Sequence, residues 1–120
     1  TLSQYGAIEA VKNSDEEVEN MVKQYNQRRR FLLSELERLG LDCFEPGGAF
    51  YVFPSIKKTG MTSEEFATKL LESQKLAVVP GTAFGDCGEG FLRISYAYSL
   101  TDLKKGLERL QRFINKLQAE

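Results

Sequence analysis

The chain has 120 residues and a formal net charge of −1, a size that fits one domain with its own hydrophobic core. Acidic and basic residues are interspersed, which excludes the basic surface of a nucleic-acid-binding protein and the polybasic patch of a membrane-surface protein. The absence of histidine excludes Ser-His and Cys-His catalysis and the commonest metal-ligand sets, so we expect no metal site.

Cysteine usage and hydropathy indicate the compartment. Cys43 and Cys87 lie far apart and form no CxxC pair, which argues against a zinc site and a disulfide scaffold. No apolar run reaches the roughly 20 residues of a membrane helix, and no signal-peptide pattern opens the sequence. We therefore expect a cytoplasmic protein without a membrane partner.

Two helices are predicted in the first 40 residues. Over 16–39 the apolar residues recur at the three-and-four spacing of a helix with one buried stripe. Ser14 and Glu17 predict a capping box at its start. A shorter helix over 3–12 is predicted before it, weakened by Gly6. The stripe of the long helix consists of Val18, Met21, Val22, Tyr25, Leu32, Leu36 and Leu39.

The middle of the chain alternates strand and helix signals. The aromatic and β-branched run at 49–53 predicts a strand, and LAVV at 76–79 predicts another. Between them, Thr62 and Glu65 form a capping-box pattern that opens a helix over 63–73.

A third strand is predicted over 91–96, and its alternation separates two faces. Leu92, Ile94 and Tyr96 share the more apolar face, whereas Phe91, Arg93 and Ser95 share the other. After this strand, Ser99 and Asp102 predict the start of a last helix that runs to about residue 118.

This order of elements predicts an α+β fold: a two-layer sandwich with a small three-stranded mixed sheet and helices packed on one face. Residues 80–90 are too few for a crossover helix, so the second and third strands should be antiparallel neighbours. The strand at 49–53 has aromatic residues on both faces, with Phe50 on one and Tyr51 on the other. We expect a second domain or subunit to cover the sheet, with ordinary exposed aromatics as the alternative.

Arg93 is the candidate binding residue. It follows a glycine-rich loop, shares its face with Phe91 and Ser95, and has no acid beside it in the strand. A guanidinium in that setting suits a carboxylate, which it binds through two parallel hydrogen bonds. The alternative is an arginine that only extends its charged end to solvent from a one-sided sheet.

Three stretches together resemble the C-terminal part of the class I and II aminotransferases, pyridoxal-phosphate enzymes of fold type I. They are YNQRRRFLLSELERLGL, PGGAFYVFP and FATKLLESQKLAVVPGTAFGDCGEGFLRISYAYS. The similarity runs along essentially the whole chain and is strongest to the bacterial and archaeal branch that acts on aspartate, aromatic or similar amino acids.

The resemblance implies that Arg93 binds the α-carboxylate of the substrate and that Phe50, beside Gly48, borders the substrate pocket. It also implies that residues 1–120 are the small domain of a homodimeric parent enzyme. Residues 1–13 would then connect this domain to a large domain that holds the cofactor, pyridoxal 5'-phosphate. The parent would transfer an amino group between an amino acid and a 2-oxo acid.

The chain departs from the family in lacking the motif of the lysine that binds the cofactor as a Schiff base. Its nine lysines lie in polar helix faces or a loop, without the apolar pocket that lowers an amine's pKa for such chemistry. We therefore predict no catalytic and no cofactor-binding residue here and expect the 120 residues alone to be inactive. A pyridoxal-phosphate β-lyase sharing this domain, and a free-standing domain that binds carboxylates or proteins, stay open as alternatives.

Overall fold

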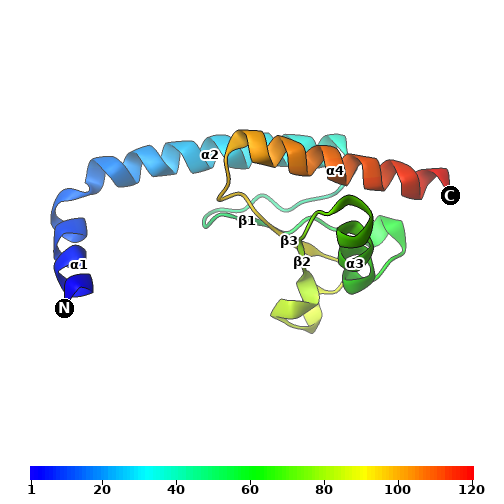
Figure 1. Ribbon diagram of the computed structural model, residues 1–120, viewed down its shortest axis with the longest axis horizontal. Coiled ribbons are helices and arrows are strands. Elements are labelled where there is room, and N and C mark those ends of the chain that lie inside the picture. The colour runs from blue at the N-terminus through cyan, green and yellow to red at the C-terminus, as the bar shows by residue number, and fades with distance from the viewer.

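The computed structural model describes all 120 residues and has four α-helices and three short strands, which are labelled in Figure 1. Two 3-10 turns, Gly81–Phe84 and Asp86–Gly88, join the second and third strands. The elements are α1 (Leu2–Asn13), α2 (Asp15–Arg38), β1 (Tyr51–Val52), α3 (Ser63–Gln74), β2 (Val79–Pro80), β3 (Leu92–Ser95) and α4 (Leu100–Ala119).

The helix predictions are confirmed, and the predicted ends lie within one or two residues of the observed ends. The Thr62 hydroxyl accepts the Glu65 N–H at 3.2 Å, and the Thr62 N–H donates to the Glu65 carboxylate at 3.4 Å, so this capping box forms. Ser14 precedes α2, but its side chain makes no capping hydrogen bond, so the predicted box with Glu17 is wrong. Acidic residues in the first turn of α2 still interact favourably with the positive end of the helix dipole.

The fold is α+β, as predicted, but every strand pair in its sheet is antiparallel. β3 lies in the centre and pairs antiparallel with β1 on one side and β2 on the other. The prediction of a mixed sheet is wrong because β3 lies between β1 and β2. The α3 connection makes β1 and β2 run in the same direction, but these two parallel strands never pair.

Two strands are shorter than their sequence patterns. β1 starts only at Tyr51, because Ala49 has a φ of 60°, which no extended strand contains. β2 is limited to Val79 and Pro80 at the edge of the sheet, where a proline without an N–H is tolerated. An apolar, β-branched run therefore predicts a strand's place better than its length.

The core lies between the sheet and the helices. α2 and α4 lie side by side above the sheet in Figure 1, and α3 lies below α4, next to β2. The rings of Phe66 on α3 and Phe113 on α4 meet edge to face with centroids 4.9 Å apart. From the sheet, Val52, Leu92 and Tyr96 face these helices and are at most 1% exposed. This confirms which face of the third strand is buried.

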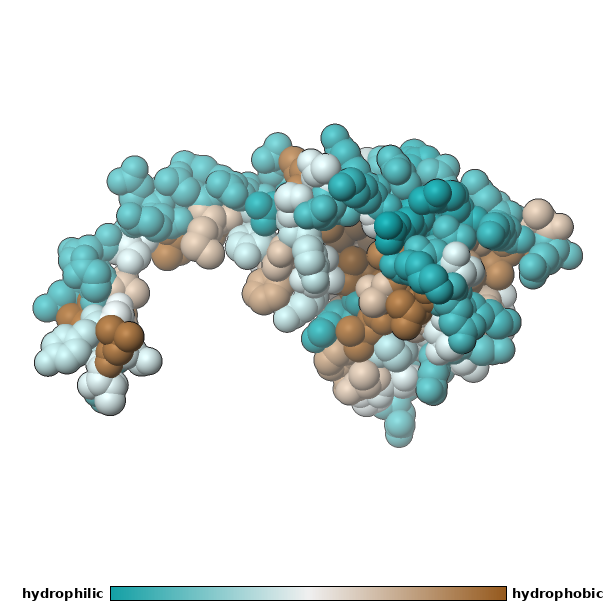
Figure 2. Space-filling model, in the orientation of Figure 1, coloured by the Kyte–Doolittle hydropathy of each residue, from teal (hydrophilic) through white to brown (hydrophobic).

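α1 extends away from this core, at the left of Figure 1, and none of its residues is buried. Its apolar side chains are exposed, including Leu2 at 90% and Val11 at 82%. Figure 2 shows apolar surface on α1 and along the adjacent part of α2. None of the helices combines the length and the apolar character that crossing a bilayer requires.

The loop before β3 is fastened to the N-terminus of α3 by Ser63. The buried Ser63 hydroxyl accepts the N–H of Gly90 at 2.8 Å and that of Phe91 at 3.1 Å. The Ser63 N–H donates in turn to the Glu89 carboxylate at 2.9 Å, which places a negative charge at a helix N-terminus. These bonds set the position from which β3 begins.

Replacing Ser63 with alanine should lower the free energy of unfolding by about 1 to 3 kcal/mol, because the buried N–H of Gly90 loses its acceptor and the N–H of Phe91 keeps only its bond to the Gly88 carbonyl. Urea denaturation of the purified protein measures this. The matched control is Ser73→Ala in the same helix, since Ser73 is exposed and makes no hydrogen bond through its side chain; it should change stability by less than about 0.5 kcal/mol. Equal effects of the two substitutions would contradict this account of the loop.

Candidate functional site

Arg93 lies in β3 on the face of the sheet opposite the helices, as the alternation of the strand predicted. Its guanidinium carbon lies 4.4 Å from the ring centroid of Tyr51 and 4.4 Å from that of Phe84. We refer to Tyr51, Phe84 and Arg93 as the Arg93 cluster. Stacking on aromatic rings holds a guanidinium while its N–H groups stay available.

The guanidinium makes no ion pair with any acid of the chain. The four ion pairs of the protein involve other arginines and lysines: Arg29 with Glu45, Arg38 with Glu35, Lys58 with Asp42, and Lys69 with Glu65. The Arg93 guanidinium also donates no hydrogen bond to another side chain or to the backbone of the chain, and the residue is only half-buried. A fork of N–H donors that is oriented but not paired internally is suited to an external carboxylate.

The two aromatic partners reach Arg93 from different elements. Tyr51 belongs to β1 and pairs with Ser95 of β3, so its side chain stands on the same face as Arg93. Phe84 ends the first 3-10 turn, which begins at Gly81. That turn is anchored by the Gly81 N–H, which donates to the Phe91 carbonyl at 2.8 Å.

Sequence reasoning identified Arg93 but missed Tyr51 and Phe84 as its neighbours. The alternation of β1 places Tyr51 and Phe53 on one face, yet the register between β1 and β3 is needed to bring Tyr51 to Arg93. Phe84 lies in a loop without periodicity, so no sequence signal assigns its contact. The rings of Phe53 and Phe84 also meet edge to face, with centroids 6.0 Å apart.

The structure brings Phe50 next to the Arg93 cluster and places Gly48 in a different hollow. The Phe50 ring lies 4.5 Å from the ring of Tyr51 and stacks on Tyr25 at 5.9 Å. Gly48 lies in an open groove of about 940 Å³ between α2 and the loop before β1, and Arg93 does not line it. The predicted roles of Phe50 and Gly48 at a substrate pocket remain proposals.

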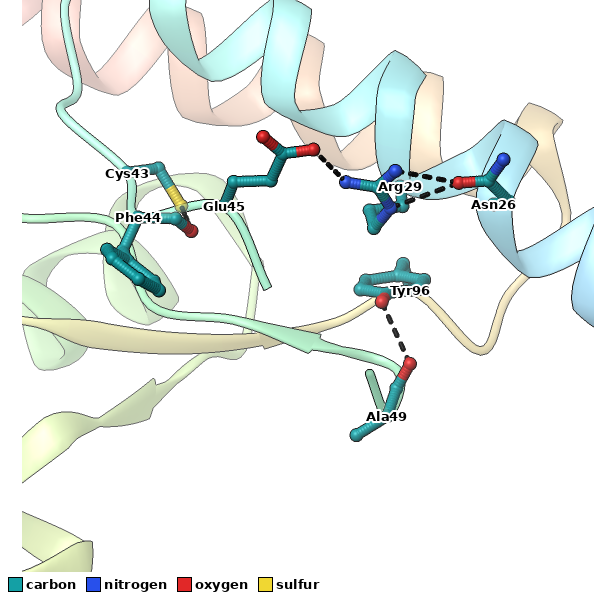
Figure 3. A network of polar contacts seen from close by, with 7 residues as sticks. All are labelled: Asn26, Arg29, Cys43, Phe44, Glu45, Ala49 and Tyr96. Carbon is teal, nitrogen blue, oxygen red and sulfur yellow. Dashed lines mark hydrogen bonds and ion pairs between the residues drawn. The ribbon is translucent and has the colours of Figure 1, made fainter. Parts of the chain in front are cut away.

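Figure 3 shows the polar contacts around this groove. Arg29 of α2 donates to the Glu45 carboxylate at 2.5 Å and to the Asn26 side-chain oxygen at 2.7 Å. Below it, the Tyr96 hydroxyl donates to the Ala49 carbonyl at 2.9 Å. Burial raises the pKa of the Tyr96 phenol, and the charge of Arg29 opposes this with a smaller effect.

Cys43 lies at the edge of the same loop and is not suited to be a nucleophile. Burial raises the pKa of its thiol, and a hydrogen bond with the Phe53 backbone opposes this with a smaller effect. Since the thiolate is the reactive form, a raised pKa keeps the sulfur in its unreactive state.

A second cavity, of about 500 Å³, lies between the edge strand β2 and α4. Arg93 and Ser95 contribute to its lining, but most of it is apolar, from Leu76, Val78, Leu103 and Leu107 among others. Such a lining suits packing of a further segment better than binding of a charged ligand.

The residues of this chain do not fit a Schiff-base site for pyridoxal phosphate. All nine lysines are exposed: Lys12, Lys23, Lys57, Lys58, Lys69, Lys75, Lys104, Lys105 and Lys116. An amine that forms a stable Schiff base needs an apolar surrounding, whereas these nine side chains extend into solvent. The arrangement therefore favours a site for a carboxylate over a site for the aldehyde group of the cofactor.

Comparison with known proteins gives consistent results. The sequence model of the family "Aminotransferase class I and II" matches residues 1–110. The chain is 50% identical over 115 residues to a putative aminotransferase, YugH, of Bacillus subtilis, and this region covers 96% of the chain and 30% of that protein. It is 43% identical over 118 residues to an aspartate aminotransferase of Pyrococcus abyssi, covering 97% of the chain and 30% of that protein.

Solved structures agree with these matches. A crystal structure of "Pyrococcus protein-A1" superposes with a TM-score of 0.92 at 42% identity, over 96% of the chain and 30% of that structure. An aromatic aminotransferase from Pyrococcus horikoshii OT3 superposes with a TM-score of 0.86 at 42% identity, over 89% of the chain and 28% of that structure. The chain thus spans about 30% of the length of the curated relatives. It belongs to the class I and II aminotransferases.

Proposed function

We propose that this chain is the C-terminal domain of a pyridoxal-phosphate-dependent aminotransferase, and that Arg93 binds the α-carboxylate of its substrate. One observation carries the proposal. The Arg93 guanidinium is held against two aromatic rings on the helix-free face of the sheet, and no acid of the chain pairs with it. Membership of the family supplies the reaction, transfer of an amino group between an amino acid and a 2-oxo acid.

The chemistry of the site favours a carboxylate over other ligands. A guanidinium offers parallel N–H donors at the spacing of two carboxylate oxygens, and its charge persists at every physiological pH. Binding the carboxylate at a fixed point orients the rest of the amino acid for reaction. Phe50, beside Tyr51, would then border the side of the pocket formed by this domain, with Gly48 in the turn before it.

The remaining parts of the enzyme belong to the portion of the parent protein outside this chain. Bound there, pyridoxal phosphate would supply the electron sink for the reaction. The exposed apolar side chains of α1 and the uncovered aromatics Phe53 and Phe84 support a large domain that packs against this one, with residues 1–13 as the connection. A cytoplasmic homodimer is the form that we propose for the parent.

The test of the reaction uses the full-length protein with pyridoxal phosphate, a 15N-labelled amino acid and an unlabelled 2-oxo acid. We expect the label to appear in the amino acid formed from the 2-oxo acid. Release of labelled ammonia would instead indicate a β-lyase that shares this domain. No turnover with a panel of amino acids, together with carboxylate binding, would indicate a binding domain without catalysis.

A further inference from the structure

The turn before β1 has an unusual backbone. Ala49 has a φ of 60°, and only one other non-glycine residue, Lys75, has a positive φ. Lys75 follows the last turn of α3, a position where such a conformation is common. Ala49 has no such explanation, because its Cβ makes this region unfavourable. A residue held there needs contacts that keep it there.

Tyr96 supplies those contacts. Its hydroxyl donates to the Ala49 carbonyl at 2.9 Å, as Figure 3 shows, and its own N–H donates to the Phe50 carbonyl at 2.9 Å. The Tyr96 side chain is 1% exposed and packs edge to face against Tyr25, with ring centroids 6.3 Å apart. Its position is therefore fixed by the core, while its hydroxyl reaches the turn.

The turn determines where the aromatic residues beside Arg93 lie. Directly after Ala49, the ring of Phe50 is placed between Tyr25 and Tyr51, at 5.9 Å and 4.5 Å. The Tyr51 ring in turn lies 4.4 Å from the Arg93 guanidinium. A change of backbone conformation at Ala49 would shift Phe50 and Tyr51 first, since they are the next two residues.

We propose that Tyr96 is a positioning residue of the carboxylate site, which holds the left-handed turn at Ala49 through its hydroxyl and so places Phe50 and Tyr51 beside Arg93. This inference rests on the proposed function of Arg93. Tyr96 itself lies on the helix side of the sheet, opposite Arg93, so its effect on the Arg93 cluster would be transmitted by the Ala49 backbone. Because burial favours its neutral form, the phenol retains the proton that it donates.

The test compares hydroxyl-deleting variants of the full-length enzyme, with the amino acid that gives the fastest turnover in the labelling assay. Tyr96→Phe keeps the buried ring and removes only the hydrogen bond to Ala49. We expect KM for the amino acid to rise about 3- to 10-fold, the range of one lost hydrogen bond, and kcat to change less than about two-fold. Tyr98→Phe is the matched control, since Tyr98 is 58% exposed and lies two residues away.

Two further variants separate positioning from a general loss of packing. Ala49→Gly removes the Cβ that disfavours the turn, so adding it to Tyr96→Phe should bring KM back toward the wild-type value. In a Tyr51→Leu background, Tyr96→Phe should raise KM less than two-fold further, because the ring that it places is gone. Thermal unfolding of each variant records changes in stability separately. If Tyr96→Phe alone folds poorly, the double variant with Ala49→Gly is measured in its place.

The outcomes distinguish this inference from the function on which it rests. If Arg93→Ala raises KM and Tyr96→Phe does not, Tyr96 is not a positioning residue and the role of Arg93 stands. If Tyr96→Phe raises KM but Ala49→Gly gives no recovery, the turn is not the route and the inference is overturned. If Arg93→Ala leaves KM unchanged, the proposed carboxylate site and the role of Tyr96 in it both fall.

Discussion

Replacing Arg93 with alanine in the full-length protein should weaken binding of the amino-acid substrate by about 2 to 5 kcal/mol. This corresponds to a loss of affinity of roughly 30- to 4,000-fold. The reason is that the carboxylate would lose both hydrogen bonds of the guanidinium fork and its counter-charge. Steady-state kinetics with the best amino-acid donor measures the change in kcat/KM.

Arg112→Ala is the matched control for this experiment. Arg112 is an exposed arginine of α4 without an ion pair in the chain, so its loss should leave kcat/KM unchanged. Arg93→Lys adds a second comparison, because lysine keeps the charge and loses the two-pronged geometry; we expect an intermediate affinity. Wild-type affinity in Arg93→Ala would remove Arg93 from the carboxylate site.

Replacing Gly81 with alanine should lower the free energy of unfolding by about 3 kcal/mol, at the upper end of the usual cost of overpacking. A Cβ at position 81 would lie 2.1 Å from the Gly88 carbonyl oxygen and 2.9 Å from that of Phe91. Both are backbone atoms, so no side chain can move aside. The loop would have to open, and Phe84 would leave Arg93 with it. Urea denaturation and substrate affinity should therefore both change.

Gly47→Ala tests whether the effect of Gly81→Ala is specific to this contact. A Cβ at Gly47 meets nothing within 4 Å, and its φ lies outside the positive range. We expect a change in stability below about 0.5 kcal/mol for this substitution. If Gly81→Ala were tolerated equally well, the loop would be more plastic than its packing indicates, and Phe84 would not depend on it.

The local patterns of the sequence were sufficient to predict the helices and the face of the sheet that carries Arg93. Helical periodicity and capping signals depend on residues three or four apart, which interact whatever the rest of the chain does. The capping box of Thr62 with Glu65 formed, and Arg93 lies opposite the buried Leu92. By contrast, the strand at 49–53 was predicted too long, because nothing in its composition indicates the left-handed turn at Ala49.

Short-range patterns were enough to predict an α+β fold with apolar helix faces turned to one side of a sheet and an arginine on the other side. Three features arise only in the folded chain: β3 lies between β1 and β2, Tyr51 and Phe84 meet at Arg93, and the Tyr96 hydroxyl reaches Ala49. The difference lies in the range of the interactions. Strand order, register and loop closure join residues dozens of positions apart, and these are selected by the packing of the whole domain.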